Sequence, residues 1–385
     1  MGSDLVEVLI NSIKIVTIFL IMVQVVPLLV WVERRGSAFI QYRFGPNRIG
    51  PLGLFQLLAD AVKFLNKEEF VPKEANRFLF YLAPVISLVP GALAMMAIPF
   101  SVPLEIESLN LFGQQWGPYS IPMQGAVIPM GILYVFGVSS LATYGLLIAG
   151  WGSNNKYALM GSLRASAQMV SYELALGLSV IGAIILYGSF DLTEIIQAQM
   201  GSLNFNFMGG TYGIGFLPNW GIFYQPVGFI LFLTAAFAES NRLPFDLPEA
   251  EAELVAGYHT EYGGFKMNLF YIGEYGHMIA ASALVVIFYF GGYDIPGFTT
   301  ESLTEALSAF ASTPTQLSLF VSLAYLGSMI LKLSIFLWIY IWVRWTLPRF
   351  RYDQLMDLGW KTMLPWALGN AIVTAVFVFL AHYKG

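Results

Sequence analysis

Acidic residues concentrate in one stretch, Ala238–Gly264, which lies between two strongly apolar segments. The stretch reads AESNRLPFDLPEAEAELVAGYHTEYGG, and its carboxylates are Glu239, Asp246, Glu249, Glu251, Glu253 and Glu261. The chain as a whole is 57% hydrophobic and 11% charged, so such a cluster stands out. Crowded carboxylates at a membrane boundary repel one another and lose hydration, and both effects favour a bound proton or cation. We therefore expect the stretch to hold or pass protons, or to bind something cationic.

Helix capping explains part of this cluster. Asp246-Leu-Pro-Glu249 resembles a capping box with proline at the first helical position, and acids in a first turn interact favourably with the helix dipole. Capping does not explain Glu253 and Glu261, or Glu239 before the loop. Glu249 and Glu253 would share a helix face, where like charges repel, so protons, arginines or water must offset the repulsion. We expect a functional role in addition to capping.

A few charged residues also lie within the apolar segments: Lys14, Glu173, Glu274 and Lys332. Each costs a few kcal/mol unless it is paired or hydrated. Glu173 follows Arg164 by nine residues, which places it about 13 Å deeper along one helix, near the middle of the membrane. It is either functional or a structural carboxylate paired with a neighbouring lysine or tyrosine, and Lys332 is a plausible partner. Tyr172 and Tyr275 each adjoin an intramembrane glutamate and could extend a hydrogen-bond path.

The apolar segments themselves define the class of protein. A mean hydropathy of +0.67 over 385 residues is typical of a polytopic membrane protein. A spanning helix needs about 20 apolar residues. That rule predicts eight spans, at roughly 6–32, 79–100, 124–149, 165–188, 222–241, 271–291, 317–343 and 363–382. The first has no small-residue cleavage site, so we interpret it as a retained anchor. We expect an all-α fold with one membrane domain over residues 1–385.

Basic residues predict the orientation in the membrane. Of the 19 lysines and arginines, sixteen lie in the first, third, fifth and seventh loops, and the second, fourth and sixth loops hold none. The positive-inside rule places the odd-numbered loops in the cytoplasm and both termini outside. The acidic cluster, in the fifth loop, is then cytoplasmic.

The first loop carries a second unusual pattern. After Gly-Pro-Asn and Gly-Pro, the run Leu52–Leu65 has apolar residues at three- and four-residue spacing, which predicts an amphipathic helix lying along the bilayer surface. The helix could simply anchor the loop. Alternatively, it could wall an opening through which a lipophilic molecule enters from the bilayer, with arginines at the mouth to meet a polar headgroup.

The rest of the composition excludes several chemistries. The chain has no cysteine, so it can form no disulfide and offers no thiolate to an iron–sulfur cluster or zinc ribbon. Its three histidines, His259, His277 and His382, lack the paired spacing of haem or zinc ligands. We expect no metal site, and any redox chemistry would belong to centres held by partner subunits.

Three long runs resemble a known family: ERRGSAFIQYRFGPNRIGPLGLFQLLADAVKF, GSLRASAQMVSYELALGLSVIG and AFAESNRLPFDLPEAEAELVAGYHTEYGGFKMNLFYIGEY. They are similar to the family of the H subunit of bacterial respiratory complex I, whose mitochondrial counterpart is NADH dehydrogenase subunit 1. The resemblance covers essentially the whole chain. It implies a proton-pumping NADH:quinone oxidoreductase of the bacterial inner membrane, in which this subunit joins the membrane and peripheral arms and is not active alone.

The resemblance also implies roles for individual residues. The quinone channel positions are Arg34, Arg43 and Asp60, and the proton path positions are Glu173, Glu239, Asp246, Glu249, Glu251, Glu253 and Glu274. Ubiquinone or menaquinone would be the substrate, and FMN and iron–sulfur clusters would lie in partner subunits. Partners would be the peripheral-arm subunits of the quinone site, small membrane subunits of the proton path and the lipid bilayer, with no nucleic acid.

Two other functions are compatible with these features. One is a homologous membrane subunit of a complex linked to ferredoxin, coenzyme F420 or hydrogenase, which copurifying soluble subunits would distinguish. Hydrogenase-linked relatives bind no quinone, so the complete first-loop motif argues against them. The other is a stand-alone ion-coupled transporter, which predicts inverted repeats and broken helices that the sequence does not display.

Overall fold

The computed structural model describes residues 2–107, 109–111, 114–116, 118–207, 210–246 and 256–383. Within these ranges seven helical segments are long and apolar enough to cross a membrane. They are α1 (Gly2–Ile40), α3 (Arg77–Met96), α4 (Gly131–Ser139) with α5 (Leu141–Gly152), α6 (Lys156–Tyr187), α11 (Gly264–Tyr289), α13 (Pro314–Thr346), and α14 (Tyr352–Asp357) continuing through the π-helical turn η3 (Leu358–Met363) into α15 (Leu364–Tyr383). The polytopic helical class predicted from the sequence is confirmed.

The expected count of eight spans is not reached by length alone. The segment predicted at 222–241 contains the short α8 (Gly221–Tyr224) and then α9 (Pro226–Glu239), which has 14 residues. A helix of that length extends about 21 Å, less than the roughly 30 Å of a bilayer's apolar core. Pro226 begins α9 at its N-terminal turn, so α8 and α9 do not form one continuous rod.

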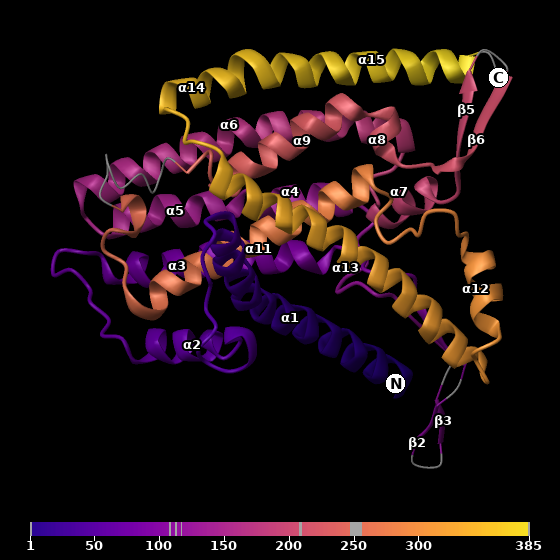
Figure 1. Ribbon diagram of the computed structural model, residues 1–385, viewed down its shortest axis with the longest axis horizontal. Helices are drawn as coiled ribbons and strands as arrows, with labels where there is room; N and C mark the ends of the chain where they lie inside the picture. Colours follow the sequence, from indigo (N-terminus) through magenta and orange to yellow (C-terminus); the bar gives the residue numbers. More distant parts are fainter. Residues whose placement is uncertain are drawn as a thin grey trace.

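The long helices pack in a layered bundle. In Figure 1, α15, α6, α5 and α3 lie one below another, and successive members of this series are in contact. α9 lies against α6, and α11 lies against α3. The start of α1 and the end of α15 lie at one end of the molecule, and α2 (Gln56–Asn66) lies toward the other. The acidic stretch therefore follows α9 at the end of the bundle nearer α2.

Close approach of α3 and α11 depends on a glycine. A Cβ atom added at Gly273 would lie 2.7 Å from the Ser87 carbonyl oxygen, closer than real Cβ atoms come to backbone. On the opposite side of the same turn of α3, a Cβ at Gly145 of α5 would lie 2.7 Å from the Ser87 nitrogen. Small residues let membrane helices pack backbone to backbone. Here they bring α11, and with it Glu274, into the centre of the bundle.

The first loop forms the predicted surface helix. α2 follows the single 3₁₀ turn η1 (Pro51–Gly53), and it begins later than predicted because Leu52 has a left-handed conformation, with φ of 54°. The apolar side chains of Leu58, Val62 and Leu65 are all exposed. Their three- and four-residue spacing makes one apolar stripe along the helix, as expected for a helix that lies in a membrane interface.

The loops at the opposite end hold β-hairpins that the sequence pattern does not predict. β1 (Leu104–Ile106) pairs antiparallel with β4 (Tyr119–Ile121), with Leu104 opposite Ile121, and β2 (Leu109–Leu111) pairs with β3 (Gln114–Trp116). β5 (Ser202–Phe207) pairs with β6 (Gly210–Pro218), and two short helices, α7 (Leu192–Gln199) and α12 (Thr300–Ser308), complete this end. These segments alternate polar and apolar residues over too few positions to be separated from loop by pattern alone.

Candidate functional site

Glu33, near the end of α1, is the centre of a buried group of charges. Its Oε1 atom lies 2.5 Å from the Arg344 guanidinium of α13. Its Oε2 atom accepts a hydrogen bond of 2.5 Å from the Tyr275 hydroxyl of α11, and the Arg242 guanidinium lies 3.8 Å away. A buried carboxylate needs such partners because loss of hydration is costly. Glu33 thus ties together α1, α11, α13 and the segment after α9.

Arg242 connects this group to Glu274. Its Nε atom is 2.6 Å from Glu274 Oε1, and its guanidinium lies over the Tyr275 ring, 3.9 Å from the centroid. The side chain is only 6% exposed. Burial by itself lowers the pKa of Arg242, but the carboxylates of Glu274 and Glu33 raise it above its usual value. Arg242 is therefore a fixed positive charge between two carboxylates.

Sequence pattern does not assign Glu33 or Arg344 to a site. Both stand at the ends of apolar segments among several other charges, and 311 positions separate them. A signal does exist: Glu33 is the first acid after the apolar run of α1, and helix α1 continues through Arg34 to Ile40 instead of ending there. A charged residue inside a helix that packs in a bundle requires a partner, but the sequence does not say which arginine provides it.

Three small cavities run alongside the acidic residues. The first is lined by Glu239, Ser240 and His277 among apolar side chains, the second by Glu239, Asn241, Glu274 and His277, and the third by Asn241, Arg242, Asp246, Glu274 and Arg344. The space open to the centre of a water molecule is about 10, 20 and 10 Å³. Each is roughly enough for one water. Neighbouring cavities share lining residues, so they form a series from Asp246 to Glu239.

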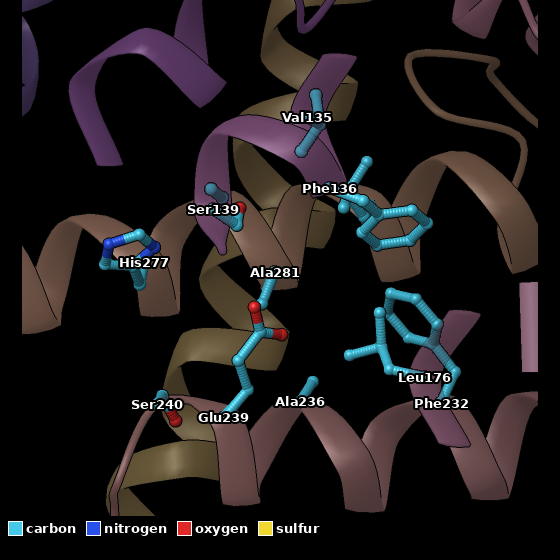
Figure 2. Close-up of a pocket in the computed structure, with 12 residues that line it drawn as sticks. Val135, Phe136, Ser139, Leu176, Phe232, Ala236, Glu239, Ser240, His277 and Ala281 are labelled. Atoms are coloured by element: carbon cyan, nitrogen blue, oxygen red, sulfur yellow. The ribbon is translucent and has the colours of Figure 1, made fainter. Parts of the chain in front are cut away.

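Figure 2 shows the first of these cavities. The Glu239 side chain rises from α9 with its carboxylate beside Ala281 of α11, and Phe136 and Phe232 close the other side. His277 stands at the edge, also on α11. The Nε2 atom of His277 is buried without a hydrogen-bond partner, while the ring is hydrogen-bonded to the backbone of Ser87. Histidine spacing argued against a metal at His277 and indicated no other role for it.

Glu173 lies beyond Glu239 in this series. It is half-buried on α6, which packs against α9, and its carboxylate is close enough to Glu239 for their charges to interact. The neighbouring Tyr172 donates to the Leu355 carbonyl at 2.8 Å and does not extend the path toward Glu173. Tyr275 does extend a path, but toward Glu33.

Lys332 is not the partner of Glu173. Its ammonium donates to the carbonyls of Phe290, Gly292 and Asp294, at 2.7, 3.0 and 2.6 Å. These carbonyls belong to the turn after α11, at the far end of the bundle from the acidic stretch. Backbone oxygens that have left the helix can satisfy an ammonium as well as a carboxylate does, and this solution is invisible in the sequence.

The start of the acidic stretch is held firmly. Asp246 is buried and pairs with Arg349 at 3.2 Å. Gln168 of α6, fully buried, donates to the carbonyls of Ala238 and Phe245 at 2.8 Å each. Glu261, at the other end of the stretch, accepts a 2.6 Å hydrogen bond from Asn155. The predicted positions Glu249, Glu251 and Glu253 lie outside the described residues.

The first-loop residues divide into two groups. Arg34 and Asp60 form an ion pair of 2.5 Å, and Gln56 donates to the other oxygen of Asp60 at 3.0 Å, so α1 and α2 are joined by charge. Arg43 is exposed and donates to Gln41 at 2.6 Å. The structure thus brings together two of the three residues expected at a quinone channel and leaves Arg43 in the connecting turn. Among the described residues no three His, Asp or Glu side chains are grouped to hold a metal ion.

The fold and these side chains define a polytopic helical membrane protein in which buried carboxylates and arginines follow a line of water-sized cavities. A family profile described as NADH dehydrogenase matches residues 13–375. Over 381 residues, the chain is 62% identical to the H subunit of NADH-quinone oxidoreductase from Bdellovibrio bacteriovorus, with 99% of each protein covered. The first of the numbered H subunits of Cytophaga hutchinsonii is 44% identical over 376 residues, covering 97% of this chain and 98% of that protein. The H subunit of Leptospira biflexa is 43% identical over 380 residues, covering 97% and 95%.

The chain belongs to the NADH dehydrogenase family of membrane subunits, together with these H subunits of NADH-quinone oxidoreductases. The resemblance seen in the three sequence runs is confirmed. The long runs GPNRIGP and LPFDLPEAEAELVAGY extend far beyond what short motifs can specify.

Proposed function

We propose that this chain forms much of the quinone channel of a proton-pumping NADH:quinone oxidoreductase and couples quinone reduction to proton translocation. The observation that carries the proposal is the shared lining of the three cavities, which makes Asp246, Glu274, His277 and Glu239 neighbours in series. Glu173 continues the series through its charge interaction with Glu239. Interacting carboxylates titrate as a set and can pass a proton among them.

The channel would open between α1 and α2. The exposed apolar stripe of α2 suits contact with the isoprenoid tail of a quinone, which comes from the bilayer. The Arg34–Asp60 pair joins the two helices beside this stripe, and Arg43 lies in the turn between them. These three residues would meet the polar headgroup or fix the width of the opening. Whether the quinone is ubiquinone or menaquinone depends on headgroup contacts outside this chain.

Reduction of a quinone to a quinol takes up two electrons and two protons. The electrons would come from FMN and iron–sulfur clusters of partner subunits, because this chain has no cysteine. Its own side chains would contribute position and charge. It would act only as a subunit, beside the peripheral-arm subunits of the quinone site and small membrane subunits that continue the proton path.

Arg242 gives a physical basis for coupling. It contacts Glu274 at 2.6 Å and lies 3.8 Å from Glu33, so it is shared unequally between the two carboxylates. A change of charge near the quinone would alter the attraction at Glu33, and a guanidinium drawn toward Glu33 would leave Glu274 free to accept a proton. The proton would then reach Glu239 through the cavity that His277 lines.

The positive-inside pattern gives the orientation that we propose. The loop containing α2 and the acidic stretch would face the cytoplasm, and both termini would face the periplasm. The whole chain would form one membrane domain of the bacterial inner membrane.

The test uses the assembled complex reconstituted in vesicles. Glu239→Gln keeps size and hydrogen bonding but cannot exchange a proton, and the exposed Glu305→Gln on α12 serves as the matched control. We expect Glu239→Gln to reduce proton translocation and quinone-linked turnover by at least about tenfold. His277→Phe should reduce both as well, and His277→Asn less, because asparagine still supports water. Wild-type translocation by Glu239→Gln combined with Glu173→Gln, in complexes that assemble normally, would contradict the proposed path.

A further inference from the structure

A larger cavity lies at the opposite end of α1 from Glu33. It has a volume of about 480 Å³ and lies between α1 and the segment from β4 through Val127. Glu7, Asn11 and Lys14 of α1 form one wall, and Tyr119, Ser120 and Val127 stand on the other. This volume is in the range of pockets that hold small ligands. The proton path and the quinone channel use none of these residues.

The depth of this cavity in the membrane follows from helix geometry. Lys14 precedes Arg34 by 20 residues on α1, which corresponds to about 30 Å along the helix axis. The apolar core of a bilayer is also about 30 Å thick. Since Arg34 and Asp60 mark one boundary of that core, Lys14 lies close to the other. Phosphate groups of lipids occupy that level.

The charges lining the cavity have a defined order. Glu7 precedes Lys14 by two helical turns, so the two side chains lie on one face of α1, with Glu7 farther from the membrane centre. Their charges interact. The Lys14 ammonium has three donors, and its hydrogen bond to the Pro122 carbonyl at 3.4 Å uses one of them. The site thus offers a cation at phosphate level and a carboxylate just outside it.

The surface below the cavity is apolar and open. Ile13, Val16, Leu20 and Ile21 of α1 are all more than half exposed. They continue from the level of Lys14 toward the membrane centre. An acyl chain is the partner that this surface fits.

From the cavity, its depth and the order of its charges, we propose that it binds an aminophospholipid, such as phosphatidylethanolamine. The phosphate lies beside Lys14, the headgroup amine beside Glu7, and the acyl chains along the exposed face of α1. A purely anionic headgroup would place a second negative group next to Glu7, and a ligand without acyl chains would leave the apolar face uncovered. The inference does not depend on the proposed quinone and proton functions.

The test measures lipid retention by the assembled complex. The complex is purified in mild detergent, incorporated into nanodiscs containing equal amounts of phosphatidylethanolamine and phosphatidylglycerol, washed with detergent, and analysed for retained lipid by mass spectrometry. Lys14→Gln should reduce retained phosphatidylethanolamine about tenfold at limiting lipid, as expected for one charge-assisted hydrogen bond. Lys156→Gln, the same change at an exposed lysine outside the cavity, should have no effect.

A second variant tests the role of Glu7 by gain of function. Glu7→Lys gives the cavity two cations, so the retained lipid should change from phosphatidylethanolamine to phosphatidylglycerol. Unchanged selectivity in Glu7→Lys, or unchanged retention in Lys14→Gln, would overturn the proposal. If a substitution prevents assembly, a photoreactive amino acid at Val127 in the otherwise wild-type complex provides the answer. Crosslinking to aminophospholipid supports the site, and crosslinking to phosphatidylglycerol or to a polypeptide overturns it.

Discussion

Arg242 and Glu274 form a buried ion pair between the segment after α9 and helix α11, with Nε and Oε1 2.6 Å apart. Neither side chain is more than 13% exposed. The pair joins the two groups of buried charge, because Glu274 lines the cavities that lead to Glu239 and Arg242 reaches toward Glu33. Its removal should therefore affect both stability and coupling.

Arg242→Ala leaves two buried carboxylates without their shared cation, and we expect it to destabilise the protein by about 3–5 kcal/mol. Arg242→Met combined with Glu274→Met removes charge of both signs and should recover much of that loss. The measurement is the thermal inactivation temperature of the assembled complex, with the amount of complex on native gels as a check. Equal stability of the single and double variants would mean that the pair contributes nothing through its charge.

Gly273→Ala should destabilise the packing of α3 against α11. The new methyl group meets the Ser87 carbonyl at 2.7 Å, and backbone cannot move aside as a flexible side chain can. Overpacking of this kind costs about 1–3 kcal/mol. Gly327→Ala on α13 is the control, because a Cβ there meets nothing within 4 Å. The thermal inactivation temperature should fall for Gly273→Ala only, together with turnover, since Glu274 is displaced.

The Arg34–Asp60 pair should matter more for quinone reduction than for stability. The Arg34 side chain is 46% exposed, and such a pair contributes less than about 1 kcal/mol. Asp60→Asn should raise the KM for quinone while electron input to the upstream clusters persists, and Arg43→Ala should do the same. The matched control is Asp353→Asn, which disrupts the exposed pair with Arg351. A lower thermal inactivation temperature for Asp60→Asn with an unchanged KM would mean that Asp60 is structural.

Asp294 should give stability a specific pH dependence. It lies in the turn after α11, and burial raises its pKa above the usual value, although a hydrogen bond from Trp220 opposes the shift. A carboxyl whose pKa is higher in the folded state binds more protons folded than unfolded. Its contribution to stability is therefore present below the ordinary carboxyl pKa of about 4 and is lost as pH rises through the folded value.

Asp294→Asn removes this titration. Relative to the variant, wild-type stability should fall as pH rises from about 4, and the difference should level off above the folded pKa. Thermal inactivation measured over a pH series in both complexes provides the comparison. Parallel curves over the whole range would show that Asp294 has the same proton affinity folded and unfolded.

Much of the membrane architecture follows from local sequence. Apolar runs predict the spanning segments, since each spanning helix must satisfy its own backbone and face lipid or other helices. The periodicity of residues 52–65 predicts α2 because amphipathicity is a property of one helix. The acidic stretch and the isolated Glu173 and Glu274 also stand out by composition alone, since charge in an apolar run is costly wherever its partner lies.

Tertiary structure decided which charges meet. The cost of burying a charge shows that Lys332 needs partners, but only the fold provides the three carbonyls of the turn after α11. Glu33 and Arg344 are remote in sequence and become a pair because α1 and α13 pack together. The shared cavities likewise depend on how closely α9, α11 and the segment between them approach. Local pattern determines which helices form, whereas ion-pair partners and cavities depend on distances between helices that sequence periodicity does not encode.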